Sequence, residues 1–246
     1  MSKFQLNQVY QDTKKMCSKF RVKRSILYNS SNINIDLTKY NNKYEPVIEI
    51  CNEDTFDMAI RCVNNKLNPL VLNMASEYTP GGGVEHGSMA QEECLFTRSS
   101  AFLSHPKQWY PLSVTQSIYS PQITIIKDSN YKLLKYYTDI SMIAIAAVRK
   151  PKLIDNKFSQ MDYSIMYNKI KSIFEIAIIN DHDSLVLGAL GCGAFDNPPI
   201  EVAKIFKIMI DQYKHYFKYI GFAVLVVKDK DSDNLISFGD IIINNK

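Results

Sequence analysis

Residues 80–93, Pro-Gly-Gly-Gly-Val-Glu-His-Gly-Ser-Met-Ala-Gln-Glu-Glu, decide the fold that we expect for this chain. The apolar residues 71–73 before them predict the end of a strand, and the helical pattern of residues 89–103 predicts a helix after them. Glycine lets backbone amides approach a ligand closely, and the first turn of a helix has unpaired N–H groups and the positive end of a dipole. We therefore expect this loop to bind an anionic ligand.

Two adjacent acids, Glu92 and Glu93, follow the glycines and favour chemistry on an anionic substrate over simple phosphate binding. An alternative remains open, because Ser88 and Gln91 have the spacing of a capping box and acids are stabilised in a first helical turn. By that interpretation, residues 91–93 only begin a helix. It does not explain three consecutive glycines, since each costs ordering entropy and one would make a turn.

Composition indicates an intracellular, soluble globular protein. Of 246 residues, 46% are hydrophobic and 22% charged, and no apolar run is long enough for a membrane span. The first residues lack the apolar core of a signal peptide. The five cysteines are scattered and odd in number, which favours reduced thiols over disulfides or a zinc site. The net charge of +4 allows a polyanionic partner, but no dense basic run predicts sequence-specific nucleic-acid binding.

Strands and helices alternate along the chain, which predicts a mixed or largely parallel sheet with helices on both faces. Helices are expected at 3–20, 54–64, 89–103, 163–179 and about 199–216, the last capped by Asp196 or Asn197. Strands are expected at 47–50, 69–74, 139–148, 184–187 and 221–228, with a hairpin at 25–37 and two short strands within 114–127, broken at Ser120-Pro121. The basic residues 149–152 are expected to form a solvent-exposed turn, and a short tail ends the chain.

A second glycine-rich stretch, Gly-Ala-Leu-Gly-Cys-Gly-Ala-Phe at 188–195, also lies between a predicted strand and a predicted helix. Ligands of open α/β sheets bind at the carboxyl ends of the strands, so we expect both loops at one edge. Two facing amide-rich loops suit a diphosphate. Neither loop has the dinucleotide fingerprint or the P-loop pattern, which argues against a standard dehydrogenase or NTPase.

Gly81-Gly82-Gly83, seven residues and Gln91-Glu92-Glu93 resemble the signature of the poly(ADP-ribose) glycohydrolase family, GGG-X(6–8)-QEE. Residues 71–76 and 187–195 are similar to the flanking and second-loop motifs of its microbial, macrodomain-only branch, and the resemblance covers about residues 46–228. It implies a macrodomain-like three-layer α/β/α fold with a central mixed sheet. We expect residues 1–45 to form a helix-plus-hairpin extension packed on a catalytic domain of residues 46–246.

The resemblance also implies roles for individual residues. Glu93 matches the catalytic acid and Glu92 its neighbour, which holds the ribose hydroxyls. Phe195 matches an aromatic residue on the terminal ribose, and Asn73 would reach a ribose hydroxyl; a core position and a buried polar cap are the respective alternatives. The residues matched to substrate-binding loops are Gly81, Gly82, Gly83 and Gln91 in the first loop, and Gly191, Cys192, Gly193 and Ala194 in the second.

The chemistry requires a proton donor, because cleaving a ribose-ribose O-glycosidic bond would otherwise leave an alkoxide. Glu93, beside another carboxylate, is suited to donate this proton and then to activate water, so that one carboxylate acts in turn as acid and base. No cofactor or metal is expected.

Glu85 and His86 depart from the small or apolar residues expected in this spacer, which leaves substrate preference open; His86 is expected to be an exposed loop residue. The expected substrate is poly(ADP-ribose) or an ADP-ribosylated protein, with ADP-ribose as product, acted on by a monomer. A hydrolase of mono-ADP-ribose and a non-catalytic ADP-ribose reader are the alternatives.

Overall fold

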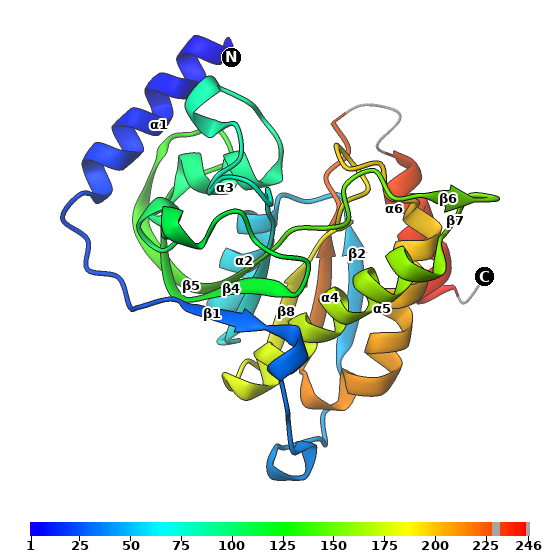
Figure 1. The fold of residues 1–246 in the computed structure, drawn as a ribbon. Helices are drawn as coiled ribbons and strands as arrows, with labels where there is room; N and C mark the ends of the chain where they lie inside the picture. The colour runs from blue at the N-terminus through cyan, green and yellow to red at the C-terminus, as the bar shows by residue number, and fades with distance from the viewer. Residues whose placement is uncertain (228–231, 245–246) are drawn as a thin grey trace.

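A seven-stranded mixed sheet with helices on both faces forms the body of the molecule (Figure 1), as the sequence predicts. The computed structural model describes residues 1–227 and 232–244. The strand order is β1-β4-β5-β3-β8-β9-β2. The strands are β1 (Ile26–Asn29), β2 (Val47–Cys51), β3 (Pro69–Met74), β4 (Gln116–Lys127), β5 (Leu133–Ile145), β8 (Ser184–Leu187) and β9 (Tyr219–Ala223). A separate two-stranded sheet contains β6 (Leu153–Ile154) and β7 (Lys157–Phe158).

The central strands are parallel, so their carboxyl ends meet at one edge of the sheet. β3 pairs in parallel with both β5 and β8, and β9 pairs in parallel with β8 and β2. Only the β1–β4 and β4–β5 pairs are antiparallel in this sheet, within the residues described. Both glycine-rich segments follow strands of this parallel region, since the first comes after β3 and the second directly after β8. This topology brings them to the same edge.

Alternating side chains divide the core into two layers, because successive residues of a strand point to opposite faces. Leu70 and Leu72 of β3 pack with α4 (Gln160–Ile179) and α5 (Pro199–Tyr213), together with α6 (Ser232–Phe238). Val71 lies on the other face with α2 (Thr55–Asn64), α3 (Gln91–Arg98) and Tyr10 of α1 (Lys3–Cys17). The three-layer arrangement expected from the sequence is therefore confirmed (Figure 1).

Most of the predicted helices begin where capping groups allow. Asp54 caps α2 by accepting bonds from the N–H groups of Phe56 (2.8 Å) and Asp57 (3.1 Å), as expected. α5 begins at the predicted residue, but the prediction that Asp196 or Asn197 caps it is wrong, because its N-cap is Pro198, which makes no side-chain cap bond. Asn197 instead uses its amide group within the preceding loop. α3 ends at Arg98 and a separate 3-10 turn covers Ala101–Leu103, so the helix predicted at 89–103 is shorter than expected.

The predicted hairpin at 25–37 is wrong. β1 pairs with β4, a partner far along the chain, and residues 30–32 and 37–39 form 3-10 turns.

The two short strands predicted within 114–127 are one strand, β4. Its pairing shifts between Ser120 and Ile123, which accommodates the proline that was predicted to break it. β9 ends at Ala223, before the predicted limit, and Lys228 lies outside the described residues. The expected tail contains α6 and a π-helical turn, Gly239–Ile243.

No helix of residues 1–227 or 232–244 combines the length and the apolar character needed to cross a bilayer.

Candidate active site

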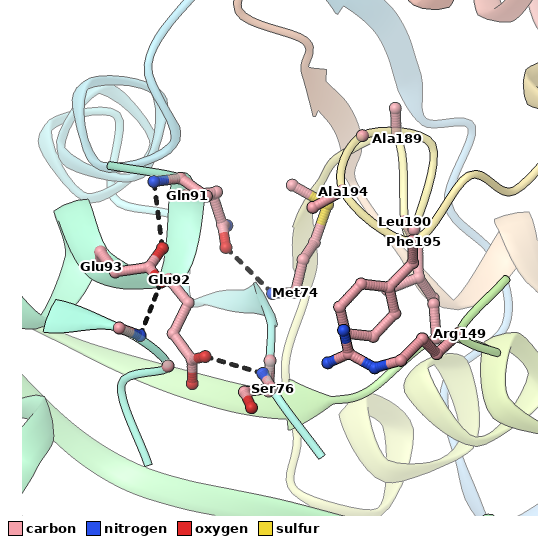
Figure 2. A pocket seen from close by; sticks show the side chains of 17 residues that line it. Met74, Ser76, Gln91, Glu92, Glu93, Arg149, Ala189, Leu190, Ala194 and Phe195 are labelled. Carbon is pink, nitrogen blue, oxygen red and sulfur yellow. Dashed lines mark hydrogen bonds between the residues drawn. The ribbon is translucent and has the colours of Figure 1, made fainter. Parts of the chain in front are cut away.

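A cavity of about 380 Å³ lies between the two glycine-rich loops (Figure 2). Its lining includes most of the residues predicted for the site: Gly82, Gly83, Gln91, Glu92, Glu93, Gly191, Gly193, Ala194 and Phe195. Asn73, Gly81 and Cys192, also predicted, are not part of the lining. The acids lie on one side of the cavity and the second loop on the other (Figure 2).

Glu92 lies at the base of the first loop and is almost completely buried, with 3% of its surface exposed. Its Oε2 accepts a bond of 2.7 Å from the Ser76 N–H, and its Oε1 accepts bonds from Asn73 Nδ2 and the Gly81 N–H, both at 3.2 Å. Burial raises the pKa of Glu92 to about 8, although these three donors favour the ionised form. The nearby charge of Glu93 acts in the same direction as burial. Glu92 is therefore largely protonated at neutral pH.

Glu93 is held by the backbone of the loop in front of it. Its Oε1 accepts a bond of 2.9 Å from the Gly83 N–H, and its Oε2 accepts one of 3.0 Å from the Ala90 N–H at the start of α3. Gly82 has a positive φ of 54°, and a Cβ built there would lie 2.6 Å from Glu93 Oε1. Glycine at this position therefore leaves room for the carboxylate.

The alternative interpretation, in which Ser88 and Gln91 form a capping box at the start of the helix, is only partly correct. The N-cap residue is Ala90, not Ser88, and the side chain that bonds back to the N-cap N–H is that of Glu93. Gln91 does not cap the helix. Its Nε2 donates to the Leu72 carbonyl at 2.7 Å and its Oε1 accepts from the Met74 N–H at 2.9 Å, so Gln91 joins α3 to the end of β3.

Asn73 lies beneath Glu92 with no exposed surface, and its Nδ2 donates to Glu92 Oε1. The structure thus places Asn73 where it positions Glu92, and its contact with a ribose hydroxyl stays a prediction.

At the carboxyl end of α3, buried Arg98 donates from Nη1 to Asp54 (2.7 Å) and from Nη2 to Asp57 (3.1 Å). These bonds fix α3 against the start of α2.

The second loop is shaped by close contacts that only glycine allows. Gly191 has a φ of 77°, and a Cβ built there would lie 2.5 Å from the Ala147 Cβ. Asn197 closes the loop, since its Nδ2 donates to the carbonyls of Val148 (2.7 Å) and Gly191 (3.1 Å). Cys192 packs against the core and its Sγ contacts the Leu190 carbonyl, so burial raises the pKa of this thiol. This packing agrees with the absence of Cys192 from the cavity lining.

The site therefore combines two adjacent acids beside a Gly-rich loop with a second, amide-rich loop on the other side of the same cavity. The sequence of residues 5–128 matches the family model described as microbial-type PARG, catalytic domain, where PARG denotes poly(ADP-ribose) glycohydrolase. The chain belongs to this family. The enzyme class is therefore that of a glycosidase acting on poly(ADP-ribose).

Solved PARG structures share the fold of this PARG-family chain. The structure from Thermomonospora curvata has a TM-score of 0.82 at 22% identity, covering 96% of this chain and 98% of that one. The same protein bound to the inhibitor ADP-HPD gives 0.79 at 23%, with 97% and 99% covered. The Deinococcus radiodurans T267R mutant in complex with ADP-ribose gives 0.77 at 23%, with 96% and 98% covered. Comparison with curated proteins gives no match.

Residues 149 and 150 lie in an exposed turn, as predicted, but Arg149 also lines the cavity of this PARG-family chain, which the prediction did not include. Its guanidinium carbon lies 4.1 Å from the centroid of the Phe195 ring, and its Nε donates to Glu77 Oε1 at 2.7 Å. Sequence reasoning could have found it, because Arg149 directly follows an apolar strand whose carboxyl end lies at the ligand-binding edge. Ser76, whose N–H bonds Glu92, is a second missed residue.

The unexpected Glu85 in the spacer faces α1 and not the cavity. Its carboxylate accepts bonds from Lys14 Nζ at 2.7 Å and from Gln11 Nε2 at 2.8 Å, and its carbonyl accepts one from Asn7 Nδ2. His86 is exposed, as predicted. The acid that departs from the family pattern therefore attaches the amino-terminal helix to the first loop.

Proposed function

We propose that this chain hydrolyses the ribose-ribose O-glycosidic bonds of poly(ADP-ribose) and releases ADP-ribose, with Glu93 as the acid and then the base. The observation that carries the proposal is the single cavity between an acid-bearing loop and an amide-rich loop. The ADP-ribose and ADP-HPD complexes of structures with the same fold support it. Membership of the microbial-type PARG family supports it independently.

In the proposed complex, the diphosphate binds the second loop at residues 191–193, where backbone amides can surround its oxygens. The terminal ribose then lies between Phe195 and the first loop, within reach of the two acids across the cavity. Glu92, neutral at pH 7, has a proton with which it can bind a ribose hydroxyl oxygen. Its bond from the Ser76 N–H fixes the direction of the carboxyl group.

Glu93 transfers its proton to the glycosidic oxygen while the bond from that oxygen to the anomeric carbon breaks. The diphosphate and nearby amides stabilise the positive charge that develops on the sugar. The Glu93 carboxylate then accepts a proton from water as the water oxygen bonds to the anomeric carbon. This step regenerates the acid and gives a ribose with a free hydroxyl on each side of the broken bond.

A Glu93→Gln variant tests the proposal. We expect the turnover number on poly(ADP-ribose) to fall by about 10²–10⁴, because a general acid contributes this much. The affinity for ADP-ribose, measured by titration calorimetry, should be retained. Glu85→Gln is the matched control, since it makes the same change in the same loop but on a side chain that faces α1.

Activity of Glu93→Gln within about tenfold of the unmodified protein would exclude Glu93 as the acid. The same assay on mono-ADP-ribosylated protein separates the alternatives. Release from that substrate but not from poly(ADP-ribose) would indicate a mono-ADP-ribosyl hydrolase. Binding of ADP-ribose without turnover of either substrate would indicate a reader.

A further inference from the structure

The cavity has an uneven distribution of charge for a site that accepts a diphosphate. Two carboxyl groups, Glu92 and Glu93, line it, whereas Arg149 is the one cationic side chain of its lining among the residues that the structure describes. The second loop contributes only amides, because residues 188–195 contain no Lys or Arg. An anionic ligand in a partly desolvated cavity interacts strongly with a charged side chain of its lining. Arg149 is therefore the side chain of this lining that can attract such a ligand by its charge.

Arg149 is held in place by its neighbours although it lies in a surface turn. Its Nε bonds Glu77, whose side chain is only 19% exposed, and its guanidinium stacks on Phe195. Tyr78 lies on it as well, with 5.4 Å between guanidinium carbon and ring centroid. The backbone gives further support, since the Lys150 N–H donates to the Phe195 carbonyl at 2.8 Å. These contacts orient the Arg149 side chain although 39% of it is exposed.

The same contacts leave the end of the guanidinium available. The bond to Glu77 uses Nε, and no hydrogen bond joins Nη1 or Nη2 to another group within residues 1–227 and 232–244. Figure 2 shows the guanidinium beside the Phe195 ring, across the cavity from Glu92 and Glu93. An arginine with four unused N–H donors in a fixed plane is well suited to bind phosphate oxygens.

We propose that Arg149 is a substrate-binding residue that donates from its Nη groups to a phosphate of the substrate at the Phe195 side of the cavity. The inference rests on the proposed function, because it assumes an ADP-ribose ligand. The phosphate belongs either to the ADP-ribose unit bound in the cavity or to the next unit of the polymer. Both sources present the same phosphate chemistry.

The test compares Arg149→Gln with Lys150→Gln, which removes the same charge from the adjacent, exposed residue. ADP-ribose affinity is measured by calorimetry and the KM for poly(ADP-ribose) by a release assay. Arg149→Gln should weaken binding about 10- to 100-fold, the effect of losing charge-assisted hydrogen bonds. The control should change it less than about threefold, as a solvated surface charge does. Arg149→Lys should recover part of the loss, because it keeps the charge but not the planar fork.

Each outcome decides the question. Weaker ADP-ribose binding assigns the phosphate to the bound unit, whereas a raised KM for the polymer alone assigns it to the next unit. Arg149→Gln behaving like Lys150→Gln in both measurements would overturn the inference. If the unmodified protein binds ADP-ribose through Arg149 but hydrolyses nothing, the proposed activity fails and the inference stands. If the unmodified protein does not bind ADP-ribose at all, both fail.

Discussion

Replacing Glu92 with glutamine should change how stability depends on pH. The pKa of Glu92 is raised from 4.5 to about 8 in the folded protein, mainly by burial. Between these values, the unfolded chain has lost the proton and the folded protein still binds it. Stability therefore falls as pH rises from 4.5 to 8, and it is highest below the unfolded pKa. Glutamine has no such proton, so the variant lacks this component of the pH dependence.

The size of the effect follows from the shift. Each pH unit in this range changes the free energy of unfolding by about 1.4 kcal/mol. By pH 7 the unmodified protein has lost roughly 3 kcal/mol that it has at pH 4.5. The amide that Glu92→Gln introduces also alters the bonds with Ser76 and Asn73, but that contribution is independent of pH. It shifts the curve of the variant without changing the difference in slope.

Urea unfolding at several pH values between about 5.5 and 7.5 measures this difference. The free energy of unfolding of Glu92→Gln minus that of the unmodified protein should increase by roughly 2 to 3 kcal/mol across the interval. Glu85→Gln should follow the unmodified protein, because Glu85 titrates below this range: Lys14 and Gln11 lower its pKa despite partial burial, which acts to raise it. Parallel curves for Glu92→Gln and the unmodified protein would refute the protonated, buried state of Glu92.

Two further predictions concern the loops and the ligand. Gly82→Ala should lower turnover on poly(ADP-ribose) at least about tenfold, because its Cβ would lie 2.6 Å from Glu93 Oε1. Unchanged turnover in this variant would contradict this geometry. ADP-ribose affinity should fall roughly 3- to 10-fold between about pH 7 and 9 as Glu92 ionises beside an anionic ligand. Calorimetry at both pH values should find this fall absent in Glu92→Gln, and its persistence there would assign the fall to another group.

Features encoded locally could be predicted from the sequence. The cap at Asp54 predicted the start of α2, and the apolar runs at 47–50 and 69–74 predicted β2 and β3, each within about one residue of its observed limits. Glycine spacing likewise predicted both loops, and positive φ together with close approach restricts Gly81, Gly82 and Gly191 to glycine. The common edge of the two loops followed from parallel topology, which alternating strands and helices imply.

Features that depend on distant partners could not be predicted in the same way. A short apolar strand at residues 26–29 followed by a turn is compatible with a local hairpin, but it pairs with β4, which begins only at Gln116. The position of Arg149 after a strand points to the ligand-binding edge, but its stacking on Phe195, a residue from a distant part of the chain, could not be predicted. The orientation of Cys192 away from the cavity is also set by tertiary packing, since the neighbouring glycines allow either direction.

Glu92 and Glu93 are consecutive, but their side chains lie in different surroundings. Neighbouring residues of a helix point about 100° apart, so the two side chains leave the first turn of α3 in different directions. Glu92 points under the end of β3, where desolvation keeps it protonated, and Glu93 points along the glycine loop, where backbone N–H groups bind both of its oxygens. A neutral Glu92 removes one negative charge from a cavity that must accept a diphosphate. The buried acid thereby lowers the repulsion that the pair would otherwise exert on such a ligand, and under the proposed function Glu93 carries out the proton transfers.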